Sequence, residues 1–540
     1  MICSLFVFSV AFSHNERHIF IKMKNYMRGE LVTERRRFFY NGALLAAVGI
    51  AIRAVGMLFN AYITRTVGAE GIGLYTIIMT VYSFAITFAT SGLSLTVTRL
   101  VAADIGENSG RGVRRILFNS TIYALIFSTA AAVSLLFLSK YLGITVLSDS
   151  RTVLPLKILA LSLIPIALSS LYGGYFVGVR RVANNAVAQV MGQIFKISVT
   201  VFFTIRYAPR GIDAAVIALA VSTTLTEALS FLVALVQYLI DKRRLTRERG
   251  DKQRSFYDVA SMALPLAVSA YIRSALLTLE HVLIPMRLRK RGDSLSESLS
   301  AYGMLHGMAL PLLILPLSPL SSFAGLLVPE FAESMAAGKD ERMRRIANRA
   351  LNVTLSYAVV LSVFLATFSE ELGYVVYDSY GVGRYIRLLS PVIPIMYLDH
   401  VTDSVLKGIG EHVYSMWVNI IDSLLSVLLV FWLIPVMGIG GYAVVIVVME
   451  GFNFILSATR LYKRIPFKIN VFKSVLLPLL SAVLSSALCR TLFVMNGGEA
   501  KALWLIFKLI FSGAICFAAY KILRGAFRIL SASKKQKGLL

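Results

Sequence analysis

Charged residues and cysteines are both scarce in this sequence. Only 16% of its 540 residues are Asp, Glu, Lys or Arg, whereas soluble domains carry about 25%. The cysteines Cys3, Cys489 and Cys516 show neither a metal-ligand spacing nor a paired framework. We therefore expect no disulfide and no zinc site, and the low charge argues against an ordinary soluble protein.

Several catalytic signatures are also absent. The sequence contains no GxxxxGK[ST] phosphate loop, no HExxH and no GxSxG, and each of these motifs has a defined chemical role. No loop on the predicted outer side is long enough for a catalytic domain. We expect a non-enzyme without a cofactor or metal, and any uphill transport would draw on an ion gradient or the membrane potential.

Long apolar runs dominate what is present. Hydrophobic residues make up 57% of the chain, and the mean hydropathy is +0.72. A helix needs roughly 20 apolar residues to cross a bilayer, and continuous rather than alternating runs favour helices over a barrel. The sequence predicts an all-α polytopic membrane protein with about 14 spans, at 38–63, 72–97, 116–139, 154–177, 186–206, 213–239, 257–283, 300–327, 347–368, 385–406, 412–435, 438–459, 471–494 and 502–523.

The basic residues orient these spans. The net charge is +26, and Lys and Arg concentrate in alternate loops, as cytoplasmic loops of membrane proteins do. The segment from Arg287 to Arg291 is the exception on the outer side. We expect both termini in the cytoplasm, basic loops in contact with anionic lipids rather than nucleic acid, and a location in the cell membrane.

The polar linker 241–256 divides the predicted spans into six and eight. We expect an N-terminal lobe and a C-terminal lobe joined by this linker. Residues 1–37 form a cytoplasmic extension, and Met23 or Met27 is an alternative start. The predicted parts of the chain are therefore 1–37, 38–240, 241–256, 257–460 and 461–540.

A weak internal repeat relates the first two spans of each lobe. Arg53 and Arg273 occupy matching helices, and a Gly/Tyr cluster follows each, at 73–75 and 301–303. Internal repeats are common in transporters, where the substrate path lies between the repeats.

Ionisable residues inside the spans are candidates for function, because each costs about 2.5–3.5 kcal/mol on insertion scales. Arg53 and Arg273 are the candidate substrate ligands. Glu280 lies two helical turns after Arg273 on the same face, and two interpretations remain open: a structural ion pair, or separate roles in a water-filled cavity. The further candidates for coupling or cavity charges are Glu227, Asp399 and Asp403, whereas for Asp422 and Glu450 we favour simple hydration.

Proline and glycine mark two structural features. Pro311, Pro316 and Pro319 fall in one predicted span and Pro391 and Pro394 in another, which predicts kinks. Gly174 and Gly178 have the GxxxG spacing that permits close helix packing.

Several segments, in order and at the right spacing, resemble the stage V sporulation protein B family over about residues 38–530. They are TRTVGAEGIGLY (64–75), TSGLSLTVTRLVA (90–102), GGYFVGVRRVANNAVAQVMGQIFKIS (173–198), LPLAVSAYIRS (264–274), LIPMRL (283–288), AYGMLHGMALPLLILP (301–316) and LVPEFAES (327–334).

That family is part of the multidrug/oligosaccharidyl-lipid/polysaccharide exporter superfamily and is similar to the lipid II flippases. The resemblance implies 14 helices in two lobes around a central cavity. It implies movement of an undecaprenyl-pyrophosphate-linked sugar from the inner to the outer leaflet. A peptidoglycan precursor for the spore cortex is the favoured substrate, with cell-wall synthesis proteins as partners.

One feature departs from the lipid II flippases, whose first helix carries two arginines six residues apart, the second followed by aspartate. Arg53 matches the first arginine, but Phe59 and Asn60 occupy the other two positions. Arg273 could supply the missing positive charge for a pyrophosphate.

Three other functions remain open. A cation-coupled multidrug exporter of the same superfamily would carry an acidic residue in the first span, and none lies between Phe38 and Val67. A non-transporting scaffold for wall synthesis would leave the charges inside both lobes without a role. An intramembrane glycosyltransferase is disfavoured by the short outer loops.

Overall fold

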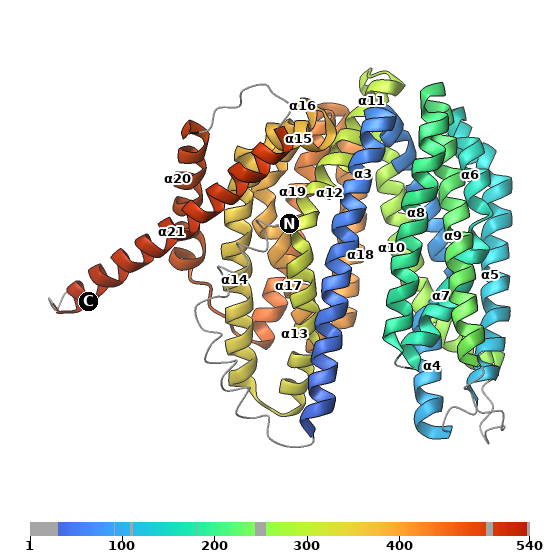
Figure 1. The fold of residues 1–540 in the computed structure, drawn as a ribbon, viewed down its shortest axis with the longest axis horizontal. Helices are drawn as coiled ribbons and strands as arrows, with labels where there is room; N and C mark the ends of the chain where they lie inside the picture. The colour runs from blue at the N-terminus through green and yellow to red at the C-terminus, as the bar shows by residue number, and fades with distance from the viewer. Residues whose placement is uncertain are drawn as a thin grey trace. The chain divides into compact units, whose positions relative to one another are not determined.

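The computed structural model describes residues 31–90, 92–108, 112–179, 181–242, 255–492 and 501–536. These residues are almost entirely helical and contain no β-strand (Figure 1). A helix satisfies its own backbone hydrogen bonds within one segment, so it is the structure that long apolar runs adopt in lipid. The predicted all-α membrane fold is confirmed.

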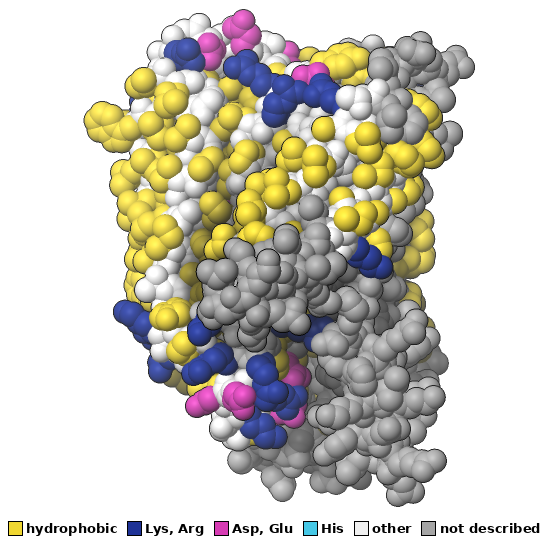
Figure 2. Space-filling view, turned by 90° about the vertical axis from the view of Figure 1, so that its left-hand side faces the viewer, with side chains coloured by type: hydrophobic (Ala, Val, Ile, Leu, Met, Phe, Trp, Pro, Cys, Tyr) yellow, Lys and Arg dark blue, Asp and Glu magenta, His cyan; other side chains and the backbone are white. Residues whose placement is uncertain are grey.

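Ten helices in the described residues are long and apolar enough to cross a membrane, and the bent pair Ser150–Ala160 and Leu163–Gly178 makes an eleventh if it is one span. On the face in Figure 2, hydrophobic side chains predominate across the middle of the described surface, and most charged side chains gather toward its ends. This is the pattern of a multi-pass membrane protein. The count of 14 spans stays a prediction, and residues 1–30 of the predicted extension lie outside the described residues.

Contacts divide the chain into two compact units. The N-terminal unit comprises residues 62–307 and 423–442, and the C-terminal unit comprises the rest of the described chain. The expected lobe boundary at 241–256 falls largely on residues 243–254, which lie outside the described residues, so it stays a prediction.

The N-terminal unit contains most of the first half of the chain. It begins within α3 (Leu31–Thr90), which is interrupted at Gly68, where φ is 79° and ψ is 174°. It continues with α4 (Leu93–Asn108), α5 (Val113–Tyr141), η1 (Leu142–Val146), η2 (Ser150–Thr152), α6 (Val153–Ala160), α7 (Leu163–Gly178), α8 (Val182–Tyr207), η3 (Ala208–Arg210), α9 (Ile212–Lys242), α10 (Phe256–Arg291) and α11 (Leu295–Tyr302).

The core of this unit lies among α4, α5, α7, α9 and α10. Leu93 and Val97 of α4 and Leu171 of α7 are fully buried in it. A Cβ atom on Gly174 would lie 2.5 Å from the carbonyl oxygen of Ser94, so only glycine allows α7 this close to α4. The close packing predicted from the GxxxG spacing is confirmed.

The C-terminal unit contains η4 (Gly303–Ala309) from Met308 onward, α12 (Leu310–Ile314), η5 (Leu315–Leu317), α13 (Ser318–Ala336), α14 (Asp340–Thr367), α15 (Ser369–Tyr377), α16 (Tyr380–Leu389), η6 (Ser390–Val392), α17 (Ile393–Gly408), α18 (His412–Met437), α19 (Ile439–Arg464), η7 (Phe472–Leu476), α20 (Leu477–Leu492) and α21 (Lys501–Gln536). Residues 423–442 of α18 and α19 belong to the N-terminal unit. The main core of the C-terminal unit forms where α13, α14 and α17 meet, around Phe331, Ala347 and Val401.

The prolines interrupt regular helix where the sequence predicts kinks. Pro316 lies in the 3₁₀ turn η5 between α12 and α13, and Pro391 lies in the 3₁₀ turn η6 between α16 and α17. Because proline has no backbone N–H, the helix cannot continue its hydrogen bonds at these points. The predicted kinks in both segments are confirmed.

Candidate functional site

The two candidate arginines lie on long helices. Arg53 is part of α3, and its side chain is outside the described part of the structure. Arg273 is near the middle of α10, and its side chain is exposed. It has no hydrogen bond or ion pair among the described residues. A guanidinium in this position on a membrane helix requires water or an anion as its partner.

Glu280 follows Arg273 on α10 but lies in a different environment. It is 8% exposed and is hydrogen-bonded to the hydroxyl of Ser426. Within the described residues the two side chains form no ion pair, so the structural pairing considered from the sequence is not present in this conformation.

Polar contacts fasten this stretch of α10 to α3. The hydroxyl of Ser274 donates to Oγ1 of Thr87 at 3.2 Å, and that of Thr278 donates to the carbonyl oxygen of Thr80 at 3.4 Å. The part of α10 that contains Arg273 and Glu280 is therefore hydrogen-bonded to α3 within the N-terminal unit.

Glu227 of α9 lies in a second polar region of the N-terminal unit. Lys196 of α8 interacts electrostatically with it, and the hydroxyls of Tyr75 and Thr223 are hydrogen-bonded at 3.2 Å. Sequence reasoning missed Lys196, although a lysine in the middle of the predicted span 186–206 is a detectable signal.

Four carboxylates gather in the C-terminal unit. Asp399 and Asp403 lie one turn apart on α17, and the charges of Asp399, Asp422 of α18 and Glu450 of α19 act on one another. The structure therefore brings Asp422 and Glu450 to the candidates Asp399 and Asp403. The described residues contain no group of three or more His, Cys, Asp or Glu side chains placed to hold a metal ion.

The two aspartates of α17 have different partners. Asp403 pairs with Lys407 at 2.5 Å and accepts a hydrogen bond from Ser415. Asp399 is hydrogen-bonded to Ser457, while its Oδ1 is buried and has no hydrogen-bond partner among the described residues. Asp403 is thus neutralised locally, whereas Asp399 keeps acceptor capacity for a proton or cation.

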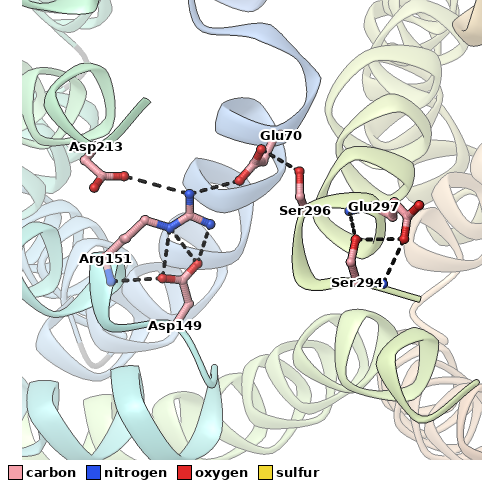
Figure 3. Close-up of polar contacts among 7 residues, drawn as sticks. All are labelled: Glu70, Asp149, Arg151, Asp213, Ser294, Ser296 and Glu297. Carbon is pink, nitrogen blue, oxygen red and sulfur yellow. Dashed lines mark hydrogen bonds and ion pairs between the residues drawn. The ribbon is translucent and has the colours of Figure 1, made fainter. Parts of the chain in front are cut away.

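A third polar group surrounds Arg151 (Figure 3). Its guanidinium binds Asp149 through Nε at 3.0 Å and Nη2 at 2.8 Å, and Nη1 lies 2.9 Å from Glu70 and 3.8 Å from Asp213. The hydroxyl of Ser296 donates to the other oxygen of Glu70 at 2.6 Å. Arg151 therefore links three separate segments of the chain, and Glu70 adds a fourth through Ser296.

The four segments are the connections between consecutive pairs of predicted spans: the break at Gly68, the turn before α6, the start of α9 and the start of α11. In the predicted orientation all four lie on the outer side. Sequence reasoning missed this network because its members lie between the predicted spans or, like Asp213, at the first residue of one, where charges cost little.

Comparison with known proteins places this arrangement in a family. A model of the family described as "Polysaccharide biosynthesis protein" matches residues 38–335, and a model described as MatE matches residues 296–432. Stage V sporulation protein B of Bacillus subtilis (strain 168) is 27% identical over 445 residues, which cover 81% of this chain and 86% of that protein.

Lipid II flippase MurJ of the same organism is 23% identical over 483 residues, or 83% of this chain and 87% of the relative. The solved structure of lipid II flippase MurJ in an inward closed conformation superposes with a TM-score of 0.68 at 14% identity, covering 90% of this chain and all of that one. This likeness shows a shared fold. The chain belongs to the polysaccharide biosynthesis protein family, and its predicted resemblance to stage V sporulation protein B and the lipid II flippases is confirmed.

Proposed function

We propose that this protein is a flippase that moves a lipid-linked oligosaccharide from the inner to the outer leaflet of the cell membrane. The substrate is an undecaprenyl-pyrophosphate-linked sugar, and the first candidate is a peptidoglycan precursor such as lipid II. The similarity to stage V sporulation protein B and lipid II flippase MurJ supports this class of substrate. The similarity to a sporulation protein supports a role in sporulation, for which the proposed substrate is a precursor of the spore cortex.

The observation that carries the proposal is the exposed guanidinium of Arg273 in the middle of α10. Facing hydrocarbon, it would cost at least about 2.5–3.5 kcal/mol. A path for an anionic head group removes that cost, because a guanidinium binds a phosphate through two parallel hydrogen bonds. Arg53 is the second proposed ligand.

The carboxylates have a separate role in this proposal. Glu280, Glu227, Asp399 and Asp403 repel a pyrophosphate, so they do not bind the substrate. They are proposed to take up protons or cations and so link transport to an ion gradient. Asp399 is the leading candidate, because one of its oxygens lacks a hydrogen-bond partner in the described structure.

The remaining proposals concern the surroundings of the protein. Both termini are placed in the cytoplasm, where the basic loops contact anionic lipids, and cell-wall synthesis proteins are the proposed partners. The protein is proposed to catalyse no covalent reaction.

A multidrug exporter is the second candidate, because the MatE model matches residues 296–432. Purified protein in proteoliposomes distinguishes the two. For a flippase, lipid II placed in the lumenal leaflet becomes accessible to a membrane-impermeant amine reagent, and Arg273→Ala abolishes this while Arg273→Lys retains part of it.

Expression of the same variants in a conditional lipid II flippase mutant gives the cellular counterpart. The flippase proposal predicts growth with the wild-type chain and no growth with Arg273→Ala at equal abundance. Efflux of cationic dyes without movement of lipid II would establish the drug exporter instead.

A further inference from the structure

The side of α8 that carries Lys196 is polar along most of its length. Gln189, Gln193 and Lys196 follow one another at spacings of four and three residues, and Thr200 and Thr204 continue the series at spacings of four. Residues at these spacings lie on one face of a helix. These five residues are called the polar stripe of α8 below. They make α8 amphipathic, although its segment is apolar enough to cross a membrane.

α8 is exposed on two opposite sides. Val187, Ile194 and Ile205 are exposed, and at 3.6 residues per turn they lie on the side of α8 opposite the polar stripe. Within the stripe, Gln189 and Lys196 are exposed as well. Lipid suits the apolar side, whereas an exposed lysine in the middle of a membrane helix requires water or an anion as its partner. The stripe therefore faces a water-accessible space.

Two neighbouring helices of the N-terminal unit border the polar stripe. On one side of it, a Cβ atom on Gly192 would lie 3.0 Å from the hydroxyl oxygen of Ser230 in α9. On the other side, the hydroxyl oxygens of Thr204 and of Tyr62 in α3 are 3.5 Å apart. Thr204 is buried at this contact, while Lys196, two turns before it, is exposed. The stripe is therefore covered at one end and open around Lys196.

The charge around Lys196 is nearly balanced. Lys196 interacts electrostatically with Glu227 of α9, but among the described residues its ammonium group forms no hydrogen bond and no ion pair. Because Glu227 offsets part of the attraction of Lys196 for an anion, a single carboxylate suits this position better than a pyrophosphate, which carries more than one negative charge. The carboxamides of Gln189 and Gln193 both donate and accept hydrogen bonds, and so they can bind hydroxyl and amide groups.

We propose that the polar stripe of α8 is a second subsite for the head group of the substrate. In this subsite Lys196 binds a carboxylate, and Gln189 and Gln193 bind hydroxyl or amide groups of the sugar and its peptide. The inference rests on the proposed function, because it concerns another part of the same substrate. Arg273 remains the proposed ligand of the pyrophosphate. The subsite makes the protein selective for head groups that carry a free carboxylate.

The binding test uses the full-length protein in nanodiscs and isothermal titration calorimetry. The ligand is the water-soluble head group of lipid II, a sugar diphosphate with its peptide, prepared with free peptide carboxylates and with the same groups amidated. We expect the wild-type chain to bind the free form about tenfold more tightly, as one hydrogen bond between charged groups allows. Lys196→Met should bring this ratio close to one, and Lys196→Arg should keep most of it.

Lys140→Met is the matched control for the loss of a lysine. Lys140 is exposed in the last turn of α5 and is not part of the polar stripe, so this variant should keep the wild-type preference. The subsite is overturned if the wild-type chain binds the free and amidated forms equally. It is also overturned if the wild-type preference persists in Lys196→Met.

Flipping of the two corresponding lipids in proteoliposomes separates this inference from the proposed function. At limiting lipid concentration, we expect the wild-type chain to flip the lipid with free carboxylates faster, and Lys196→Met to flip both lipids at similar rates. A wild-type chain that binds the free form preferentially but moves neither lipid would support the subsite and overturn the proposed transport. A wild-type chain that flips both lipids at equal rates would support the proposed transport and overturn the subsite.

Discussion

Gly73 and Gly303 lie against each other through their backbones, and a Cβ atom on Gly303 would come within 2.8 Å of the Gly73 nitrogen. A Cβ atom on Gly73 would overlap the carbonyl oxygen of Leu299. These glycines belong to the two Gly/Tyr segments that the sequence pairs as a weak repeat. Small residues allow helices in membranes to approach this closely, so the repeat marks the crossing of α3 with α11 and η4.

Gly73→Ala should therefore destabilise the protein. The new methyl group meets backbone, which cannot rotate away as a side chain can, and overpacking of this kind costs about 1–3 kcal/mol. We expect a lower unfolding temperature in detergent and less protein in the membrane. Gly325→Ala is the control, because nothing lies within 4 Å of a Cβ atom at Gly325. Equal stability of the two variants would contradict this prediction, because it would mean that α3 can move away from α11 and η4 without loss of stability.

Arg151→Gln should release the connections that Arg151 joins. The variant removes the hydrogen bonds to Asp149 and the ion pair to Glu70, and hydrogen bonds to charged groups contribute about 1.5–3 kcal/mol each at most. Because Arg151 is 24% exposed, we expect a loss near the lower end of this range, measured by thermal unfolding. Arg345→Gln is the comparison: its partner Glu341 is 3.8 Å away and 85% exposed, so its loss should be below about 0.5 kcal/mol.

Glu411, between α17 and α18, should give the protein an acid-sensitive contact. Arg460 and Arg464 hold the pKa of its carboxyl below the ordinary value, with oxygen–nitrogen distances of 2.8 Å and 2.6 Å. Because the folded-state pKa is lowered, the contribution to stability is complete above the ordinary pKa of about 4.3 and is lost as the pH falls through the folded-state value.

Thermal unfolding of Glu411→Gln against wild type tests this contact. We expect the variant to be about 1 kcal/mol less stable at pH 7 and the difference to shrink below about pH 4. Glu341→Gln, at an exposed surface position, should show no such trend. A difference that stays constant down to pH 3 would mean that the lost contact is not ionic.

The sequence predicts the helices well because lipid imposes one requirement on each span separately. Apolar runs of sufficient length must be helical, and the close packing at Gly174 also follows from spacing along one helix. The proximity of Asp399 to Asp422 and Glu450 cannot be predicted from spacing along one helix, because it depends on how three helices rotate about their axes. Hydropathy alone left Asp422 and Glu450 as hydrated residues.

The Arg151 network shows more clearly that a single sequence does not predict contacts between distant residues. Arg151 and Glu70 are 81 residues apart, and Ser296 is 226 residues from Glu70. Nothing in a single sequence links polar residues in separate connections, since each is unremarkable where it stands. The stacked rings of His281 in α10 and His306 in η4 were missed for the same reason, because only the packing of α10 against η4 brings their centroids to 4.2 Å.

The last prediction concerns Arg273 and Glu280. The exposed guanidinium and the buried carboxylate form no ion pair in the described structure, so we expect separate functions. Arg273→Gln and Glu280→Gln should each reach the membrane in normal amounts and fail to flip lipid II, the first for lack of a head-group ligand and the second for lack of a titratable group. The double variant should be no better than either one.

A structural pair behaves in the opposite way. Each single change would leave one charge buried without a partner, at a cost of about 3–5 kcal/mol, and the protein would be lost from the membrane. Removing both charges would restore it, because the coupling energy between two interacting residues disappears when both are replaced. Quantifying membrane abundance and flipping for the four combinations therefore separates the two cases. Recovery of both quantities in the double variant would assign Arg273 and Glu280 to helix packing in another conformation and remove Arg273 from the substrate path.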